Sequence, residues 1–138
     1  KPVGTLAPMT IFSFHPVKTI TTGEGGMVVT NKKNFADKLR VLRTHGVVRE
    51  EHPWYYEMRE LGFNYRLTEI QSALGLAQLT HIDRFLTKRR KLAYRYIKKL
   101  TGIPYLRLPL ESQESAWHLF PIRIDFENIK RTKENLFA

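Results

Sequence analysis

Two short apolar runs and a helical spacing make up the hydrophobic pattern of the first 46 residues. Residues 9–14 and 27–30 are rich in β-branched, aromatic and other apolar side chains, so they predict two buried strands. The helix predicted after Asn31 places three apolar residues on one face: Phe35, Leu39 and Leu42. Gly46 is predicted to close this helix, because glycine readily adopts the left-handed conformation that follows helix C-termini.

The second half of the chain contains two further helical spacings. Residues 69–79 predict one helix, and after a break near His81 a longer basic helix is predicted to continue to about Leu100. The apolar stripe predicted for the longer helix has five members: Ile82, Phe85, Leu92, Tyr96 and Leu100. Such a stripe is typical of an amphipathic helix that buries one face and leaves the other in water.

Three other segments complete the predicted organisation. Residues 46–66 are irregular and rich in aromatic side chains, residues 117–125 alternate like a strand, and residues 129–137 begin another helix. The chain thus starts in a polar turn ahead of a strand and stops inside a helix. We expect a segment of a larger protein, and the mixture of strands and helices predicts an α/β fold.

Composition narrows the classes of protein that the chain can represent. Its 138 residues suffice for about one domain, and no apolar run approaches the roughly 18 residues of a membrane-spanning helix. Cysteine is absent, which excludes disulfides, thiol nucleophiles and cysteine-bound zinc and favours a reducing, cytoplasmic compartment. His45 and His52 lack a carboxylate at ligand spacing, so no metal site is predicted.

The basic charge of the chain admits two interpretations. Lys and Arg number 23 against 13 Asp and Glu, and residues 84–99 hold eight basic side chains and no acid. A basic module that binds nucleic acid or another polyanion is one function class with such a charge. The basic residues surround too much of the predicted helix to form one stripe, so a solvated helix face is favoured and no nucleic-acid partner is predicted.

The segment between the first two predicted strands carries the most informative chemistry. Lys18 follows the first strand in a loop rich in glycine, threonine and proline. A lysine partly shielded from water presents a nucleophilic amine, which can form a Schiff base with an aldehyde such as that of pyridoxal phosphate. Neighbouring hydroxyl and backbone N–H groups suit a phosphate. On spacing alone, a plain turn between two strands stays the alternative.

Three sequence blocks resemble the DegT/StrS-type sugar aminotransferases. Residues 12–31, FSFHPVKTITTGEGGMVVTN, look like that family's cofactor-lysine segment, and residues 62–75, GFNYRLTEIQSALG, match its other signature. The stretch LRTHG at residues 42–46 is also typical. The His-Pro-Val-Lys variant ending at Lys18 looks similar to the branch that aminates C4 of a UDP-linked 4-keto-6-deoxy amino sugar, as in pseudaminic-acid synthesis.

The resemblance implies a fold and a domain organisation. The fold would be part of the type I pyridoxal-phosphate-dependent transferase fold, an α/β unit with a mainly parallel sheet. Residues 1–80 would be the C-terminal part of the cofactor-binding large domain, and residues 81–138 the connecting helix and the beginning of the small domain. The acid that pairs with the pyridinium nitrogen and the residue that stacks on the ring would lie upstream, so these residues alone are expected to bind the cofactor poorly.

The resemblance also implies an activity and its residues. Lys18 would be the catalytic, Schiff-base lysine, Ser13 would hydrogen-bond the cofactor phosphate, and Asn64 would reach the phosphate in the neighbouring subunit of a homodimer. The amino donor would be L-glutamate and the acceptor a 4-keto nucleotide sugar used for cell-surface or flagellar glycans. Glu24 and Arg66 lie inside the motifs. For each of them, a role in the site and a role in a structural ion pair are equally favoured.

Further candidate substrate contacts and one alternative reaction have weaker support in the sequence. His118 and the aromatic residues 54–56 are candidates for contact with the sugar or the base, with core or interface packing as the alternative. The sugar 3-dehydratases resemble the same family but carry histidine in place of the lysine. Lys18 therefore favours an aminotransferase over a dehydratase.

Overall fold

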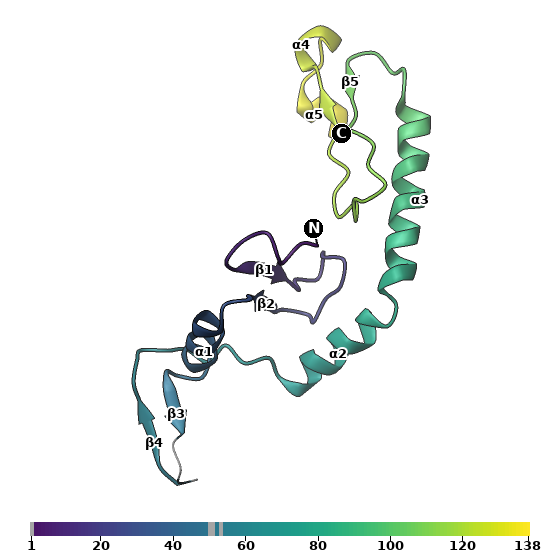
Figure 1. Cartoon of the computed structure of the whole chain (residues 1–138). Coiled ribbons are helices and arrows are strands. Elements are labelled where there is room, and N and C mark those ends of the chain that lie inside the picture. Colours follow the sequence, from purple (N-terminus) through teal and green to yellow (C-terminus); the bar gives the residue numbers. More distant parts are fainter. Residues whose placement is uncertain (1, 50–51, 53) are drawn as a thin grey trace. The chain divides into compact units, whose positions relative to one another are not determined.

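The computed structural model describes residues 2–49, 52 and 54–138. Its elements in chain order are β1 (Thr10–Ser13), β2 (Gly26–Val29), α1 (Lys33–Leu42), β3 (Val47–Arg49), β4 (Tyr56–Met58), α2 (Glu69–Leu79), α3 (Ile82–Leu100), β5 (Leu106–Arg107), β6 (Arg123–Ile124), α4 (Phe126–Ile129) and α5 (Lys133–Phe137) (Figure 1). They divide into two compact units, Lys1–Leu79 and Thr80–Ala138. Assignment of residues 1–80 and 81–138 to a large and a small domain stays a prediction.

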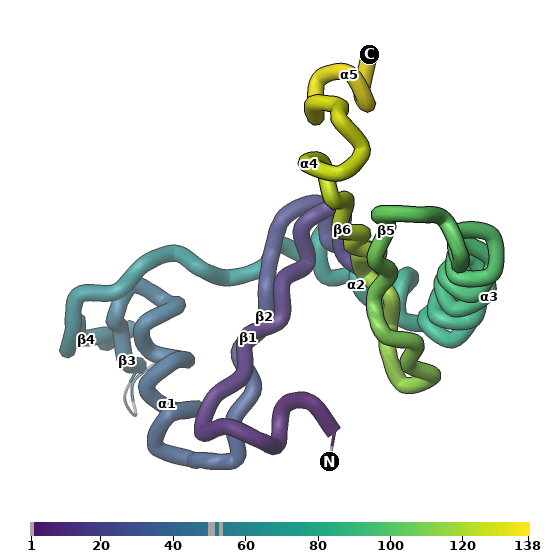
Figure 2. The backbone as a smooth tube through the Cα atoms, turned by 90° about the horizontal axis from the view of Figure 1, so that it is seen from above, coloured from purple at the N-terminus to yellow at the C-terminus, as the bar shows by residue number. Residues whose placement is uncertain are grey.

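The first unit begins with a β-hairpin. β1 and β2 pair antiparallel, with Thr10 opposite Val29, and the two strands run side by side (Figure 2). Both strands predicted from the apolar runs are therefore confirmed. Their predicted burial is wrong for the described residues, because Ile11 is 78% exposed and Met27 is 50% exposed. No second layer of the described unit covers these side chains.

The chain leaves α1 through two residues with left-handed backbone, His45 at φ 59° and Gly46 at φ 70°. α1 itself ends at Leu42, and the Gly46 N–H donates to the carbonyl of Val41 (3.0 Å). Gly46 thus closes the helix as predicted, because a glycine accepts the positive φ without a steric penalty.

Backbone hydrogen bonds then join residues 42–46 to residues 59–65, an arrangement we call the 42–46/59–65 ladder. The N–H of Phe63 donates to the Leu42 carbonyl (2.8 Å), and the His45 N–H donates to the Phe63 carbonyl (2.9 Å). The N–H of Tyr65 donates to the Arg43 carbonyl (3.0 Å). The ladder fixes the segment that leads to Asn64 against the end of α1.

The segment predicted to be irregular contains a second hairpin. β3 and β4 pair antiparallel, with Val47 opposite Met58. Each strand has only three residues, which is too short for an alternation of polar and apolar positions to be recognised in the sequence. The irregular assignment of residues 46–66 is therefore wrong over these two strands.

The expectation of a mainly parallel sheet is also corrected. In the described residues the three strand pairs, β1–β2, β3–β4 and β5–β6, are all antiparallel and two-stranded. Parallel neighbours need a long crossover connection that returns to the same edge, whereas antiparallel neighbours can be joined directly. The mixed α/β class stands, but these residues supply hairpins rather than parallel strands.

The second unit is built along the predicted basic helix, α3. Its half-buried and buried stripe contains seven residues: Ile82, Phe85, Leu86, Arg89, Ala93, Ile97 and Leu100. The predicted stripe is wrong at Leu92, which is 50% exposed, and at Tyr96, which is 44% exposed although its ring lies 5.3 Å from that of Phe120. Arg89 takes a place in the stripe because a long aliphatic stem can be covered while its guanidinium reaches polar atoms.

The C-terminal segments are shorter than predicted. Residues 117–125 contain only β6, since Trp117 has a positive φ of 47° that breaks the extended conformation at its start. The helix predicted at residues 129–137 is divided by Lys130, whose φ is 52°. α4 precedes this break and is capped by Asp125, and α5 follows it behind a capping box at Thr132.

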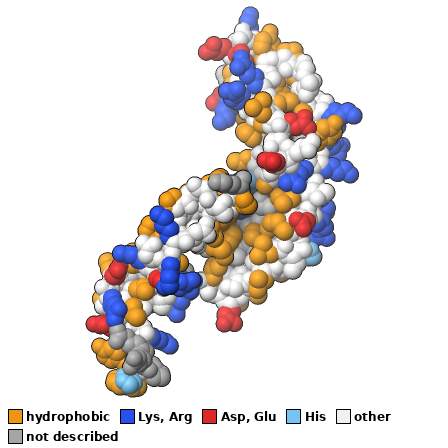
Figure 3. Space-filling view, in the orientation of Figure 1, with side chains coloured by type: hydrophobic (Ala, Val, Ile, Leu, Met, Phe, Trp, Pro, Cys, Tyr) orange, Lys and Arg blue, Asp and Glu red, His pale blue; other side chains and the backbone are white. Residues whose placement is uncertain are grey.

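Few of the described side chains are buried in either unit. Ala93 is 3% exposed and Thr22 is 4% exposed, whereas hydrophobic side chains are spread over the visible surface (Figure 3). In the part of the chain that the structure describes, no helix combines the length and the apolar character required to cross a bilayer.

Candidate functional site

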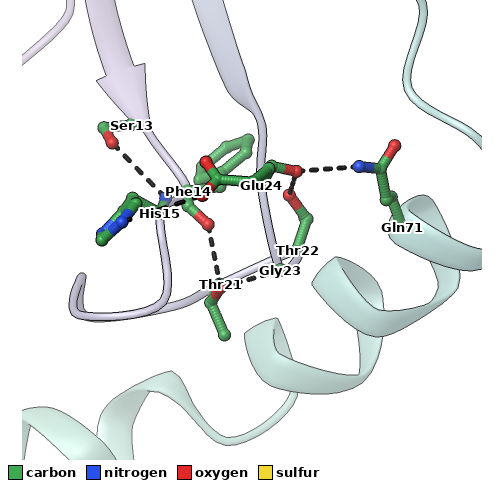
Figure 4. A network of polar contacts seen from close by, with 8 residues as sticks. All are labelled: Ser13, Phe14, His15, Thr21, Thr22, Gly23, Glu24 and Gln71. Atoms are coloured by element: carbon green, nitrogen blue, oxygen red, sulfur yellow. Dashed lines mark hydrogen bonds and ion pairs between the residues drawn. The ribbon is translucent and has the colours of Figure 1, made fainter.

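The loop between β1 and β2, residues 14–25, is closed at its base by Phe14. The Phe14 N–H donates to the Gly25 carbonyl (2.9 Å), and the Phe14 carbonyl accepts from the N–H of Thr22 (3.1 Å) and the hydroxyl of Thr21 (2.9 Å) (Figure 4). The hydroxyl of Thr21 also accepts from the N–H of Gly23 (2.9 Å). These bonds anchor both ends of the loop, so Lys18 is carried on a segment with a fixed base.

Lys18 lies in the turn that opens the loop. Its N–H donates to the carbonyl of His15 (2.9 Å), and the residue is half-buried. Among the described contacts, the Lys18 amine has neither a hydrogen bond nor an ion pair. The structure thus places a primary amine on an anchored loop and leaves it available for a ligand.

Ser13 and His15 stand beside this turn, at the end of β1. The Ser13 hydroxyl oxygen accepts from the His15 N–H (3.4 Å), and Ser13 is exposed. A hydroxyl that accepts one bond still has its own hydrogen to donate. The His15 ring nitrogen lies 3.7 Å from the Glu24 carboxylate, and both side chains are largely exposed. That contact is of the surface type, which contributes little stability.

Asn64 lies on a different segment, within the 42–46/59–65 ladder and ahead of α2. It forms a β-bridge with Thr44, its side-chain oxygen accepts from Arg66 Nε (3.2 Å), and it is exposed. No described contact joins Asn64 to Ser13 or Lys18. The structure therefore places Ser13 at the end of β1, Lys18 and Glu24 on the loop that follows it, and Asn64 on another segment of the unit. Arg66 is a hydrogen-bond partner of Asn64.

The predictions from the sequence did not include the contact between the loop and α2. Gln71 Nε2 donates to the Glu24 carbonyl (3.1 Å), and Gly75 is so close to the loop that an added Cβ would lie 2.9 Å from Thr22 Cγ2. A local signal for Gln71 does exist, because a threonine three residues before a glutamine is the pattern of a capping box. The contact to Glu24 has no local signal, since the two residues are 47 apart.

The remaining candidates belong to other segments of the chain. The rings of His52 and Trp54 stack at 5.4 Å, and His118 belongs to the second unit, where its Nδ1 is buried without a described partner. The second unit also holds an open cavity of about 410 Å³, lined by Arg90, Tyr94, Ile97, Glu111, Ser112, Gln113 and Trp117. Across the described residues, no cluster of His, Cys, Asp and Glu has the geometry of a metal site.

The chemistry of the loop residues fits pyridoxal phosphate. The aldehyde of this cofactor requires a primary amine, which Lys18 supplies, and its phosphate requires hydroxyl and N–H donors, which Ser13 and the neighbouring backbone supply. The amine of Lys18 is not engaged by another described group, and Ser13 is exposed at the end of β1. These residues are thus suited to hold the cofactor, although their assignment to it stays a prediction.

Comparison with known proteins agrees with the resemblance noted in the sequence. The chain is 43% identical over 137 residues to the UDP-4-amino-4,6-dideoxy-N-acetyl-beta-L-altrosamine transaminase of Campylobacter jejuni, an alignment that covers 98% of this chain and 36% of the relative. The chain therefore spans little more than a third of the length of that relative.

Solved structures give the same result. PseC of Helicobacter pylori, described as an aminotransferase involved in the biosynthesis of pseudoaminic acid, matches with a TM-score of 0.87 and 39% identity over 99% of this chain and 38% of its own. The PLP-form of a sugar aminotransferase from Streptococcus pneumoniae matches with a TM-score of 0.76 and 27% identity, covering 91% of this chain and 33% of its own.

A dehydratase shares the fold as well. GDP-4-keto-6-deoxymannose-3-dehydratase matches with a TM-score of 0.85 and 28% identity, covering 97% of this chain and 38% of its own. The fold alone thus does not separate the two chemistries. The profile of the DegT/DnrJ/EryC1/StrS aminotransferase family matches residues 1–137, and the chain belongs to that family.

Proposed function

We propose that the complete protein is a pyridoxal-phosphate-dependent aminotransferase that transfers an amino group from L-glutamate to the 4-keto group of a UDP-linked sugar. The observation that carries the proposal is the unengaged amine of Lys18 on its anchored loop, within the segment typical of this family. The identity of 43% to a transaminase named for a UDP-linked amino sugar supports the substrate class. A role in cell-surface or flagellar glycan synthesis, in the cytoplasm, is part of the proposal.

Lys18 has two tasks in this proposal. Its amine holds the cofactor covalently, and once displaced it removes a proton from the α-carbon of the amino donor and returns it at the cofactor's C4′ carbon. When bound, the cofactor supplies the electron sink that stabilises the negative charge left on the α-carbon. The fixed base of the loop limits the positions that the amine can take, which would favour repeated proton transfer by the same group.

Ser13 and Asn64 bind the phosphate in this proposal. The Ser13 hydroxyl has a free hydrogen to donate, and the amide of Asn64 keeps N–H donors free while its oxygen accepts from Arg66. Hydrogen bonds to a charged phosphate are stronger than those between neutral groups, so each of these donors would help to orient the cofactor. We place Asn64 at the phosphate of the neighbouring subunit in a homodimer.

The lysine distinguishes this proposal from dehydration on the same fold. A histidine at position 18 could move a proton but could not hold an aldehyde covalently, whereas the amine of Lys18 does both. The aminotransferase is therefore the function that the residue at this position supports.

Reduction of the complete protein with borohydride in the presence of pyridoxal phosphate tests the proposal. Peptide mapping is expected to find the reduced cofactor on Lys18, and the Lys18→Arg variant is expected to lack both the label and the amino-transfer activity. Lys91→Arg, a conservative change on exposed α3, serves as the matched control. A label on another lysine, or unchanged activity in Lys18→Arg, would overturn the assignment.

A further inference from the structure

Gln71 has two sets of partners that belong to different parts of the first unit. Its side-chain oxygen accepts from the backbone N–H of Thr68 (3.0 Å), and its backbone N–H donates to the Thr68 hydroxyl (3.2 Å). These two hydrogen bonds form a capping box at the start of α2. Its side-chain nitrogen donates to the carbonyl of Glu24 (3.1 Å). The carboxamide is thus held at both ends, and it ties the helix start to the Lys18 loop.

The Glu24 carbonyl is the point on the loop where two donors meet. It accepts from the Thr22 hydroxyl (2.6 Å) as well as from Gln71, as Figure 4 shows. Gly23 and Gly25 flank this peptide with φ of 80° and 150°. A backbone between two such glycines has wide conformational freedom, so the two hydrogen bonds select its orientation.

Close packing reinforces the same contact. Thr22 is 4% exposed, and both Gly75 and Gly25 approach it so closely that an added Cβ would lie 2.9 Å from Thr22 Cγ2 or 2.5 Å from Thr22 Oγ1. A glycine within a helix costs about 1 kcal/mol relative to alanine. Gly75 is buried inside α2, and the space it leaves is occupied by Thr22 of the loop.

We propose that Gln71 and Thr22 are positioning residues for Lys18, acting through the Glu24 carbonyl, an inference that rests on the proposed function. The loop is anchored at Phe14 on the β1 side and at Glu24 on the α2 side. Loss of the second anchor loosens the Glu24 peptide between the bonds that Phe14 makes to Thr22 and Gly25, and the Lys18 amine then occupies the orientation that binds the cofactor for a smaller fraction of the time.

The variant Gln71→Glu separates this role from helix capping. Glutamate keeps the oxygen that accepts from Thr68, and glutamate is accepted at this position of a capping box. It replaces the donor to Glu24 with a second acceptor, which faces a carbonyl oxygen. Gln78→Glu, two turns further along α2, makes the same chemical change and serves as the control.

The measurement is made on the complete protein. Borohydride-trapped label on Lys18 is titrated against pyridoxal phosphate, and the visible absorbance of the bound cofactor is followed as a function of pH. In Gln71→Glu, half-labelling is expected at about fivefold more cofactor, the effect of one net hydrogen bond, with a displaced pH midpoint and a slightly lowered melting temperature, because the same bond also stabilises the fold. Gln78→Glu is expected to match the wild type in all three.

Thr22 provides an independent arm should Gln71→Glu fail to fold. Thr22→Val removes the other donor to Glu24 with little change in shape and is expected to weaken Lys18 labelling in the same way. Thr22→Ser keeps the hydroxyl and is expected to restore it. Wild-type labelling and pH midpoint in a folded Gln71→Glu or Thr22→Val overturn this inference alone. Absence of label on Lys18 in the wild type overturns the proposed function and this inference with it.

Discussion

At the residue scale, Asp37 on α1 has the most clearly perturbed ionisation of the first unit. The hydrogen bond from Lys33 is the largest cause that lowers the pKa of Asp37, and desolvation opposes it. The charges of Lys33 and Arg40 and a hydrogen bond from Arg40 lower this pKa further. A carboxyl whose folded pKa is lowered stabilises the fold at pH values above its unfolded pKa. That contribution is lost as the pH falls through the lowered folded value.

Lys33→Met is therefore expected to raise the pKa of Asp37 towards its ordinary value, as measured by NMR titration of the labelled aspartate carboxyls in the complete protein. Lys38→Met is the matched control, because Lys38 lies on the same helix but pairs with Glu60 (3.3 Å). An Asp37 titration that is equal in wild type and Lys33→Met would contradict the assigned cause. The salt dependence of the effect should be large, since all these groups lie at the surface.

Individual site residues differ in how far the sequence could predict them. Ser13, Lys18 and Glu24 lie within one contiguous motif, so their proximity follows from chain connectivity as soon as two strands are recognised on either side. Gln71 and Glu24 meet only because α2 packs on the loop, and no periodicity in the sequence indicates a contact between residues 47 apart. The cofactor roles of Ser13, Lys18 and Asn64 stay predictions.

At the element scale, the junction between α1 and the 42–46/59–65 ladder depends on Gly46. Its φ is 70°, and a Cβ at this position would lie 1.7 Å from the Glu60 carbonyl oxygen, a distance that requires the backbone to move. Gly46→Ala is expected to cost about 3 kcal/mol or more of unfolding free energy, combining left-handed strain with overpacking. Urea unfolding of the complete protein measures it.

Gly23 provides the comparison for this prediction. Its φ is 80°, but an added Cβ would have nothing within 4 Å. Gly23→Ala therefore carries the left-handed strain without the clash and is expected to cost about 1 kcal/mol. Equal destabilisation by the two substitutions would show that the close approach of Glu60 to Gly46 is unimportant.

The elements themselves were predictable where the pattern was long or sharply bounded. α1, α2 and α3 follow from helical spacing, and β1 and β2 from apolar runs on either side of a glycine-rich loop. The β3–β4 hairpin was missed because each strand has three residues. The predicted stripe of α3 contained Leu92 and not Arg89, because a prediction from hydrophobicity takes no account of the contacts that a side chain makes in the fold. The Arg89 guanidinium in fact reaches the carbonyls of Trp117 (3.4 Å) and His118 (3.5 Å).

At the scale of the whole molecule, the accessible area is larger than a folded chain of this mass requires. The chain exposes 11776 Å². A compact monomer of 16.2 kDa exposes about 7,500 Å². Two separate compact units, each of about half that mass, together expose about 9,000 Å². The excess remains even when the two units are counted separately, so large apolar side chains of the described residues stay uncovered. Ile70 (84% exposed) and Leu76 (66%) on α2 are examples.

The 138-residue chain expressed alone is therefore expected to bind a hydrophobic dye such as ANS and to unfold with low cooperativity. It is also expected to give little or no visible absorbance with pyridoxal phosphate, because the chain spans little more than a third of its relative's length and so supplies only part of the contacts to the cofactor. The complete protein, measured under the same conditions, is the control. Cooperative unfolding together with the full visible absorbance from these residues alone would contradict both expectations.

Subunit mixing tests where Asn64 acts. In a symmetric dimer with shared sites, a hybrid of one Lys18→Ala subunit and one Asn64→Ala subunit contains one intact site, formed by the Lys18 of the second subunit and the Asn64 of the first. If each subunit used its own Asn64, the hybrid would contain no intact site.

Coexpression of the two variants, each inactive alone, is therefore expected to restore amino-transfer activity to about a quarter of the sites, since random pairing makes half of the dimers hybrids. Hybrids isolated through two different affinity tags should regain about half of the wild-type activity per dimer. Coexpression of Lys18→Ala with a Ser13→Ala variant is the control, because Ser13 and Lys18 are five residues apart in one chain and belong to the same site, so that hybrid should stay inactive. Inactivity of the isolated Lys18→Ala/Asn64→Ala hybrid would place Asn64 at the site of its own subunit.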